Sequence, residues 1–419
     1  MPKVICLSYH YPPFGGVAVQ RILRFTRYLS EQQFECHVLC AEPARAASVP
    51  LDSELTAEVP SQVKVHRLRT FEPECFVNNW SHPWDKVRRN FLKLFAAMLV
   101  PDDQAMWIDQ AAAAAIKLAR EIRADVLFAT GPPFSTLLAG QRAAEISKLP
   151  LVVDFRDDWT LLRRHLKTFP EARQRREEEL EQKVLRTAAA VLTVTPPLAE
   201  EMKARSPFPE RVHLLPNGFD PEHFSGVTGS GEGDGVVFSA GSLYAKREPA
   251  GFFRAWERFH QGGGKLRFEL AGPVAKDCLG YFPADRSDCR WLGFLPHREV
   301  RRRLQAASLN LAWLDPYLSV QSYTGKLLEY LGAGRPVLML GAPQSAAADL
   351  LHKSGLGFTV PVDDVDGIVE ALEKIARGDW QAHPDDSVIA PFNARQQVAE
   401  LATILNGAIS SGPKSGPQP

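Results

Sequence analysis

Short apolar runs alternate with longer amphipathic segments along most of the chain. The first two runs are VICL (4–7) and CHVLC (36–40), and a helical pattern near 17–30 separates them. Four further runs complete the first half: VKVHRL (63–68), DVLFAT (125–130), LVVDF (151–155) and AVLTVT (190–195). This alternation predicts a parallel sheet with helices on both faces.

A polar stretch interrupts the alternation near the middle of the chain. Residues 225–235 (SGVTGSGEGDG) are rich in Gly and Ser, as is typical of a linker. The second half then shows six more strand-like runs: VVFSAG (236–241), LRFELAG (266–272), CRWLG (289–293), LNLAWL (309–314), VLMLG (337–341) and GFTVPV (357–362). A chain of 419 residues is also too long for one ordinary core.

The pattern therefore predicts an α/β protein with two doubly wound parallel-sheet domains. We expect an amino-terminal domain over 1–222, a linker over 223–235 and a second domain over 236–390. Residues 391–408 are predicted to form a helix that packs back on the first domain. The composition of 409–419 predicts a disordered tail.

Composition narrows the class of protein. Lys and Arg together number 49, as do Asp and Glu, so the formal net charge is zero, which argues against nucleic acid as a principal partner. No apolar run approaches the length of about 20 residues that spans a bilayer. The six cysteines form no C-x-x-C pair, so neither a disulfide framework nor a metal site is expected. These features predict a cytoplasmic protein.

Ligands of doubly wound sheets bind at the carboxyl ends of the strands, so we looked for chemistry there. VICL is followed by SYHYPPFGGVAVQR (8–21), in which Gly15 and Gly16 precede a helical pattern. Their backbone N–H groups could cradle an anion, or the pair could form only a tight turn. Neither G-x-G-x-x-G nor G-x-x-x-x-G-K-[ST] occurs, which argues against a dinucleotide site and a phosphate loop of that type.

A charged stretch follows LVVDF: DFRDDW contains Asp154, Arg156 and Asp157 and ends at Trp159. Such charges are costly to bury without partners, so they form either an ion-paired loop or a site for a polar ligand. The tryptophan favours the ligand site, because solvated loops rarely contain one.

The second half offers a lysine after its first strand. Lys246 lies five residues after Gly241 in AGSLYAKREP. It could reach a diphosphate as a point charge, or it could be a solvated loop lysine.

The strongest local signal is SYTGKLLEYLGAGRPVL (322–338). Thr324 suits an N-cap, and a helix beginning at Gly325 and Lys326 would offer free N–H groups and an ammonium to phosphate oxygens. Glu329 lies one turn later, where it could accept hydrogen bonds from ribose hydroxyls. The alternative is a plain ion pair between Lys326 and Glu329 on a solvated helix.

Together, PPFGG, LLPNGFD (214–220), the Gly241–Lys246 spacing and KLLEYLGAGRPVL resemble glycosyltransferase family 4 over residues 3–405. The resemblance implies the GT-B fold, in which two Rossmann-like domains face each other across a cleft. DFRDDW and PDDQAMW (101–107) are also similar to a bacterial subgroup that builds cell-surface polysaccharides.

The resemblance implies a role for each matching residue. Donor-binding positions would be Gly15, Gly16, Gly241, Lys246, Gln321, Thr324, Gly325, Lys326 and Glu329, with Asn217 and Gly218 at the hinge. Catalytic candidates are Asp154, Arg156 and Lys246, and acceptor-side candidates are His10, Tyr11 and Asp157. The first Glu of the family's E-x7-E element is Gln321 here, and that residue ordinarily contacts the donor sugar.

The expected activity is transfer of a sugar from a nucleotide diphosphate sugar to a hydroxyl of a carbohydrate or lipid-linked acceptor. The resemblance implies retention of configuration. With no obvious D-x-D metal motif, we expect neither a metal nor a cofactor besides the nucleotide sugar. Two alternatives remain: a sugar-nucleotide 2-epimerase, which needs no acceptor, and a degenerate binding or scaffold subunit, which the Gln321 change motivates.

One segment bears on location. WDKVRRNFLKLFAAMLV (84–100) mixes basic and apolar residues, as is typical of a helix that lies on an anionic membrane surface. It predicts peripheral association with the inner, cytoplasmic face of the membrane. A helix packed on the first domain is the alternative.

Overall fold

The computed structural model describes residues 1–43, 51–70, 98–160, 169–225, 235–283, 286–314, 323 and 325–411. The chain divides into two units. Unit 1 comprises Met1–Pro216 together with the chain from Gln397 onward, and unit 2 comprises Asn217–Gln396. The domain edges expected at 222 and 390 therefore fall at Pro216 and Gln396.

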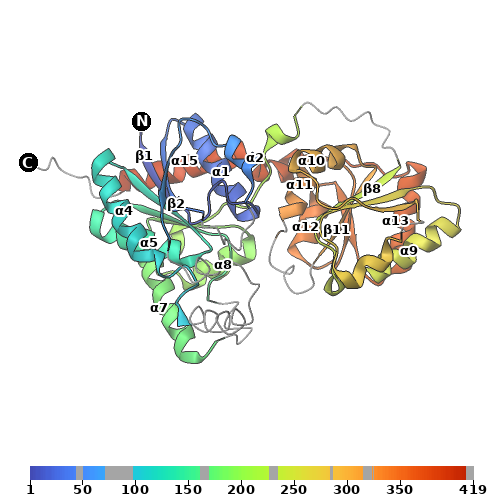
Figure 1. Ribbon diagram of the computed structural model, residues 1–419, viewed down its shortest axis with the longest axis horizontal. Helices are drawn as coiled ribbons and strands as arrows, with labels where there is room; N and C mark the ends of the chain where they lie inside the picture. Colours follow the sequence, from blue (N-terminus) through green and yellow to red (C-terminus); the bar gives the residue numbers. More distant parts are fainter. Residues whose placement is uncertain are drawn as a thin grey trace, which may run out of the picture. The chain divides into compact units, whose positions relative to one another are not determined.

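Unit 1 is built on a seven-stranded sheet with the order β3-β2-β1-β4-β5-β6-β7 (Figure 1). Its strands are β1 (Lys3–Leu7), β2 (Glu35–Ala41), β3 (Lys64–Leu68), β4 (Val126–Gly131), β5 (Leu151–Phe155), β6 (Ala190–Thr193) and β7 (Val212–Leu214). Every neighbouring pair is parallel. The order reverses between β1 and β4, which makes their carboxyl ends a switch point where ligands bind in such sheets.

Helices connect these strands and cover the sheet. They are α1 (Val17–Glu31), α2 (Ser53–Ala57), α4 (Trp107–Ile122), α5 (Phe134–Ser147), α7 (Glu171–Thr187), α8 (Pro196–Arg205) and α15 (Ala394–Ser411). All residues of β4 and β5 are buried, because helices pack on both faces of the sheet. The helix expected over 391–408 is α15, and its residues from Gln397 onward belong to unit 1.

Unit 2 contains a six-stranded sheet with the order β10-β9-β8-β11-β12-β13 (Figure 1). Its strands are β8 (Val236–Ala240), β9 (Arg267–Ala271), β10 (Cys289–Trp291), β11 (Leu309–Trp313), β12 (Val337–Leu340) and β13 (Gly357–Val360). These pairs are also parallel, and the order reverses between β8 and β11. Both sheets therefore confirm the doubly wound parallel architecture.

Successive residues of the unit 2 strands pack into two different hydrophobic cores, one on each face of the sheet. Val237 and Leu311 face a core formed with α9 (Ala250–Gln261) and α13 (Val365–Arg377). Their neighbours Phe238 and Ala312 face a second core, formed with α10 (His297–Ala306), α11 (Gly325–Ala333) and α12 (Ala346–Lys353). A short helix, α14 (Asp386–Ile389), follows α13. Because a strand alternates its side chains, one apolar run supplies both faces.

Several predicted segments fall outside the described residues: most of the linker, most of 84–100, and 412–419. In the described part of the chain, no helix is long and apolar enough to span a membrane. The five cysteines that the structure describes are free and buried.

Candidate functional site

The carboxyl end of β8 brings Gly241 against the start of α11. Gly241 has a φ of +118°, and a Cβ on this residue would lie 1.6 Å from Lys326 Nζ. Only glycine allows this backbone conformation together with so close an approach. Lys326 is the second residue of α11, so its ammonium lies at the helix start, at the switch point of the sheet.

Lys326 is a partly desolvated cation. Burial lowers its pKa to about 8; the nearby Arg247 also lowers it, and Glu329 acts in the opposite direction. Among the residues that the structure describes, no carboxylate forms an ion pair with Lys326, so the plain Lys326–Glu329 ion pair is not observed. The helix start thus presents a positive charge that Glu329 offsets only in part.

Tyr330 fixes the start of α11 against the sheet. Its hydroxyl accepts a hydrogen bond from the Ala240 N–H at 3.0 Å and donates one to the Leu311 carbonyl at 3.2 Å. Burial raises the pKa of Tyr330 to about 12, so the hydroxyl keeps its proton. The bonds join α11 to β8 and β11, on either side of the switch point. Our reading of the sequence missed this residue, although a polar tip on an otherwise apolar helix face is a usable signal.

The cation coupled to Lys326 is Arg247 rather than Lys246. Lys246 is exposed, whereas Arg247 is half-buried, and its guanidinium lies 4.7 Å from the centre of the Tyr244 ring. Arg247 also donates a hydrogen bond to the Ser242 carbonyl at 2.9 Å. Nothing in the described structure tests whether Lys246 reaches a diphosphate, so that role stays a prediction, and Arg247 is a second candidate that the sequence did not indicate.

Four other predicted donor positions belong to the same segment. Gly325 is the first residue of α11, and Glu329 is half-buried on that helix. Gln321 and Thr324 lie outside the described residues, so their roles stay predictions.

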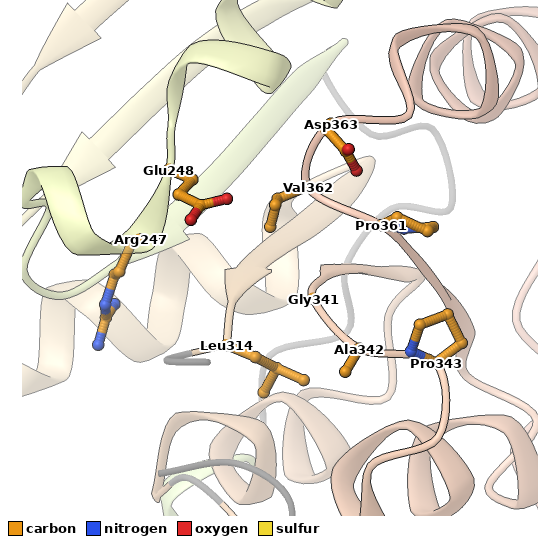
Figure 2. Close-up of a pocket in the computed structure, with 9 residues that line it drawn as sticks. All are labelled: Arg247, Glu248, Leu314, Gly341, Ala342, Pro343, Pro361, Val362 and Asp363. Carbon is orange, nitrogen blue, oxygen red and sulfur yellow. The ribbon is translucent and has the colours of Figure 1, made fainter. Parts of the chain in front are cut away.

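A cavity of about 220 Å³ opens beside Arg247. It lies at the carboxyl ends of β11, β12 and β13, where Leu314, Gly341 and Pro361 line it. Figure 2 shows the carboxylates of Glu248 and Asp363 directed toward its interior. The cavity thus places hydrogen-bond acceptors among apolar groups, a combination that suits a ligand rich in hydroxyls.

The glycine pair of unit 1 lies at the matching edge of the other sheet. Gly15 is buried, and the exposed Gly16 is the N-cap of α1 with a φ of 91°. A Cβ on Gly16 would meet nothing within 4 Å, so backbone conformation rather than space requires glycine. The first turn of α1 contains no acidic residue and the helix has no side-chain cap, which leaves N–H groups for an outside acceptor.

Asp154 is a buried structural carboxylate. It is fully buried and forms a salt bridge of 2.8 Å with Arg21. Its Oδ2 also accepts a hydrogen bond from Thr130 Oγ1 at 2.7 Å. A carboxylate held in this way has no exposed atom to offer a substrate, so the structure corrects its candidate catalytic role to one of support.

Arg156, Asp157 and His10 gather at the carboxyl ends of β1, β4 and β5. The Arg156 guanidinium donates to the Gly131 carbonyl at 3.2 Å and to the Pro132 carbonyl. Burial and the nearby Arg156 lower the pKa of His10 to about 4, so its imidazole is neutral near pH 7. Asp157 is exposed.

Two aromatic residues of these loops are structural. Tyr11 is fully buried, and its hydroxyl shares a hydrogen bond of 2.9 Å with Thr26 Oγ1, so the acceptor-side prediction for Tyr11 is wrong. Trp159 is also fully buried: it stacks on Phe134 with ring centres 4.9 Å apart and donates to Glu177 at 3.2 Å. Trp159 therefore marks a packed loop rather than a ligand site.

Comparison with protein families settles the type of the amino-terminal unit. Residues 15–218 match the model of the glycosyl transferase 4-like domain. No curated protein sequence matches the chain significantly.

Solved structures show the same fold. Anabaena HepE, solved with UDP and glucose, is 15% identical, with a TM-score of 0.61 over 97% of this chain and 100% of that one. A glycosyltransferase from Rickettsia africae is 8% identical, with a TM-score of 0.65 over 98% and 99%. A putative UDP-N-acetylglucosamine 2-epimerase from Listeria monocytogenes is 11% identical, with a TM-score of 0.61 over 100% and 99%.

The family 4 type and the GT-B fold expected from the sequence are thereby confirmed. Within this fold, the structure brings together Gly241, Lys326 and Arg247 in unit 2. In unit 1 it brings together His10 and Arg156, next to the exposed Asp157. The sequence indicated each of these except Arg247.

Proposed function

We propose that the protein transfers a sugar from a nucleotide diphosphate sugar to an acceptor hydroxyl. The observation that carries this proposal is the Lys326 ammonium at the start of α11, held against Gly241 and coupled to Arg247. Two adjacent cations and the N–H groups of a helix start suit a diphosphate, which carries adjacent negative charges. Glu329 would accept hydrogen bonds from the ribose, one turn along the same helix.

The same groups would stabilise the leaving group. As the bond between the sugar C1 and the diphosphate oxygen breaks, negative charge develops on the diphosphate. Lys326 and Arg247 would stabilise that charge, which is the principal electrostatic task in this reaction. The acceptor oxygen then bonds to C1 and passes its proton to the departing diphosphate. Because two cations supply this charge stabilisation, we propose a metal-independent reaction, with retention as the resemblance implies. Loss of turnover on adding a chelator would contradict metal independence. A product with inverted anomeric configuration would contradict retention.

Unit 1 would bind the acceptor. Gly15 and Gly16 would approach the transferred sugar, while His10 and Asp157 would offer neutral and anionic partners to hydroxyls. A neutral imidazole can accept or donate a hydrogen bond, as an acceptor hydroxyl requires. We propose a carbohydrate or lipid-linked acceptor of polysaccharide or glycolipid synthesis.

A panel of nucleotide sugars tests the proposal. HepE binds UDP, which makes UDP-glucose the first donor to examine, followed by other UDP-, GDP- and dTDP-sugars. We expect one donor to bind by calorimetry and to release its nucleoside diphosphate slowly without an acceptor. If no member of the panel binds, the protein is a degenerate scaffold and the proposal fails. Epimerised donor formed without any acceptor would instead support the activity named for the Listeria relative.

We further propose that the protein works at the cytoplasmic face of the membrane, on the basis of segment 84–100. We expect the protein to sediment with vesicles that contain an anionic lipid and to remain in solution with neutral vesicles. Sedimentation that does not depend on the anionic lipid would contradict this location.

A further inference from the structure

A buried arginine joins parts of unit 1 that are far apart in the sequence. Arg21 lies in the second turn of α1 and forms a bidentate salt bridge with Asp154. Its Nε donates to Oδ2 at 3.0 Å, and its Nη2 donates to Oδ1 at 2.8 Å. Both residues are almost completely buried, and Asp154 also accepts the Thr130 hydroxyl. One ion pair therefore connects α1 with the ends of β4 and β5.

The same guanidinium holds the last residues of unit 1. Its Nη2 donates to the Leu215 carbonyl at 2.9 Å and its Nη1 to the Pro216 carbonyl at 2.6 Å. Pro216 is the residue after which the chain enters unit 2. These four hydrogen bonds occupy most of the five N–H donors of an arginine, in a fork that a lysine cannot reproduce.

Apart from the end of unit 1, the segments that Arg21 and Asp154 join lead to the proposed acceptor side. Helix α1 begins after Gly16, and β4 ends at Gly131, whose carbonyl receives Arg156. Strand β5 runs through Asp154 directly into Arg156 and its neighbour Asp157. One buried ion pair thus links the helix that follows the Gly15–Gly16 loop to the strand that leads into Arg156 and Asp157.

We propose that Arg21 is a positioning residue for sugar transfer. It holds three segments as one rigid body: the Gly15–Gly16 loop, the Arg156–Asp157 turn and the end of unit 1 at Pro216. The kinetic part of this inference rests on the proposed function. The structural part, that these three segments are mechanically linked through Arg21, does not.

A double variant can distinguish a positioning role of Arg21 from a contribution to the stability of the fold. A buried pair replaced by two apolar side chains of similar size often leaves the folded protein equally stable. In an Arg21→Met/Asp154→Leu double variant, apolar packing replaces the pair. The carbonyls of Leu215 and Pro216 then lose their donor, so the link to the end of unit 1 is broken even if the fold is retained.

The experiment compares Arg21→Lys and this double variant with the wild type. The matched control is Arg286→Lys, which alters another shielded arginine outside the three segments: Arg286 pairs with Asp288 at 3.1 Å in unit 2. Amide hydrogen exchange is measured on the full chain, together with UDP binding and turnover of the donor that the panel selects. The double variant keeps the test decisive if Arg21→Lys fails to fold.

We expect exchange to rise about tenfold in three segments together, around 9–20, 155–160 and 213–219, which corresponds to losing roughly one charged hydrogen bond. Exchange in β2 and the UDP affinity stay unchanged, and turnover falls with an unchanged KM for the donor. Exchange that rises only in α1, or evenly over unit 1, overturns the proposal, as does wild-type turnover in the double variant. If the wild type binds no nucleotide, the proposed function fails, but the exchange pattern still decides the role of Arg21.

Discussion

The two sheets share one topology but use charge in opposite ways at their carboxyl edges. In unit 1, Arg21 is paired with Asp154, the Arg156 guanidinium is bonded to backbone carbonyls, and His10 is held neutral. In unit 2, the nearby Arg247 lowers the pKa of Lys326, and no carboxylate in the described structure forms an ion pair with Lys326. At the edge of unit 1, Arg21 and Arg156 are bonded to groups of the fold itself. At the edge of unit 2, the ammonium of Lys326 remains available to a ligand.

This difference indicates a division of labour. An uncompensated, partly desolvated cation stabilises a bound anion far more than a paired one does, because its charge is not already satisfied. The edge of unit 2 therefore suits a diphosphate. The edge of unit 1 suits neutral hydroxyls, which need placed acceptors and donors rather than net charge.

The largest effect should come from removing the ammonium of Lys326. Lys326→Met should weaken UDP binding by about 100-fold, the upper range for losing a hydrogen bond to a charged group. Calorimetry measures this. The matched control is Lys353→Met, because Lys353 is a surface lysine paired with Asp349 at 2.7 Å on α12. Equal affinity in the two variants would mean that unit 2 does not use its unpaired cation.

Binding should also depend on pH in one direction. The pKa of Lys326 is about 8 in the free protein, so the ammonium is charged at pH 7 and largely deprotonated at pH 9. Because the diphosphate favours the protonated form, affinity for UDP-glucose should fall as pH rises through 8, by about tenfold between pH 7 and pH 9. Lys326→Met should bind with a flat profile over this range. A wild-type profile that rises with pH would contradict the assignment.

The next effect distinguishes two adjacent cations. Arg247→Ala should weaken UDP binding by about tenfold, because a half-buried guanidinium beside Lys326 is lost. Lys246→Ala should have little effect, since that side chain is exposed. Parallel titrations decide between them. The reverse order would restore the role that the sequence assigned to Lys246.

The smallest effect on donor affinity should come from unit 1. Gly16→Ala forces a side chain into a backbone conformation with a φ of 91°, so the free energy of unfolding should fall by about 1–2 kcal/mol. UDP affinity should stay at the wild-type value, because the substitution lies in unit 1. Thermal unfolding and calorimetry measure the two quantities. Gly16→Trp should in addition abolish transfer, and intact transfer would remove this loop from the site.

The fold could be predicted from the sequence because the alternation of apolar runs and helical patterns is a local feature. It can be recognised without knowing which residues are in contact across the fold. Strand β7 was missed: it has three residues, and Leu214 is 39% exposed, so no apolar run marks it. The start of α11 was predicted because a glycine, a lysine and an apolar helix face are local signals. Spacing alone could not choose between Lys246 and Arg247, which are neighbours.

The errors in unit 1 have a common cause. Asp154 meets Arg21 across 133 positions of sequence, and no local pattern reveals such a partner. Tyr11 and Trp159 stand among polar residues in the chain, yet tertiary packing buries both. Polar and charged residues at a strand end therefore predicted where the site lies. They did not predict reliably what each side chain does there.

A crystal structure of the protein grown with UDP would show where the diphosphate binds. We expect phosphate oxygens bonded to Lys326 Nζ and to the N–H groups at the start of α11, with Arg247 beside them. A diphosphate bound instead at the His10–Arg156 edge of unit 1 would contradict it.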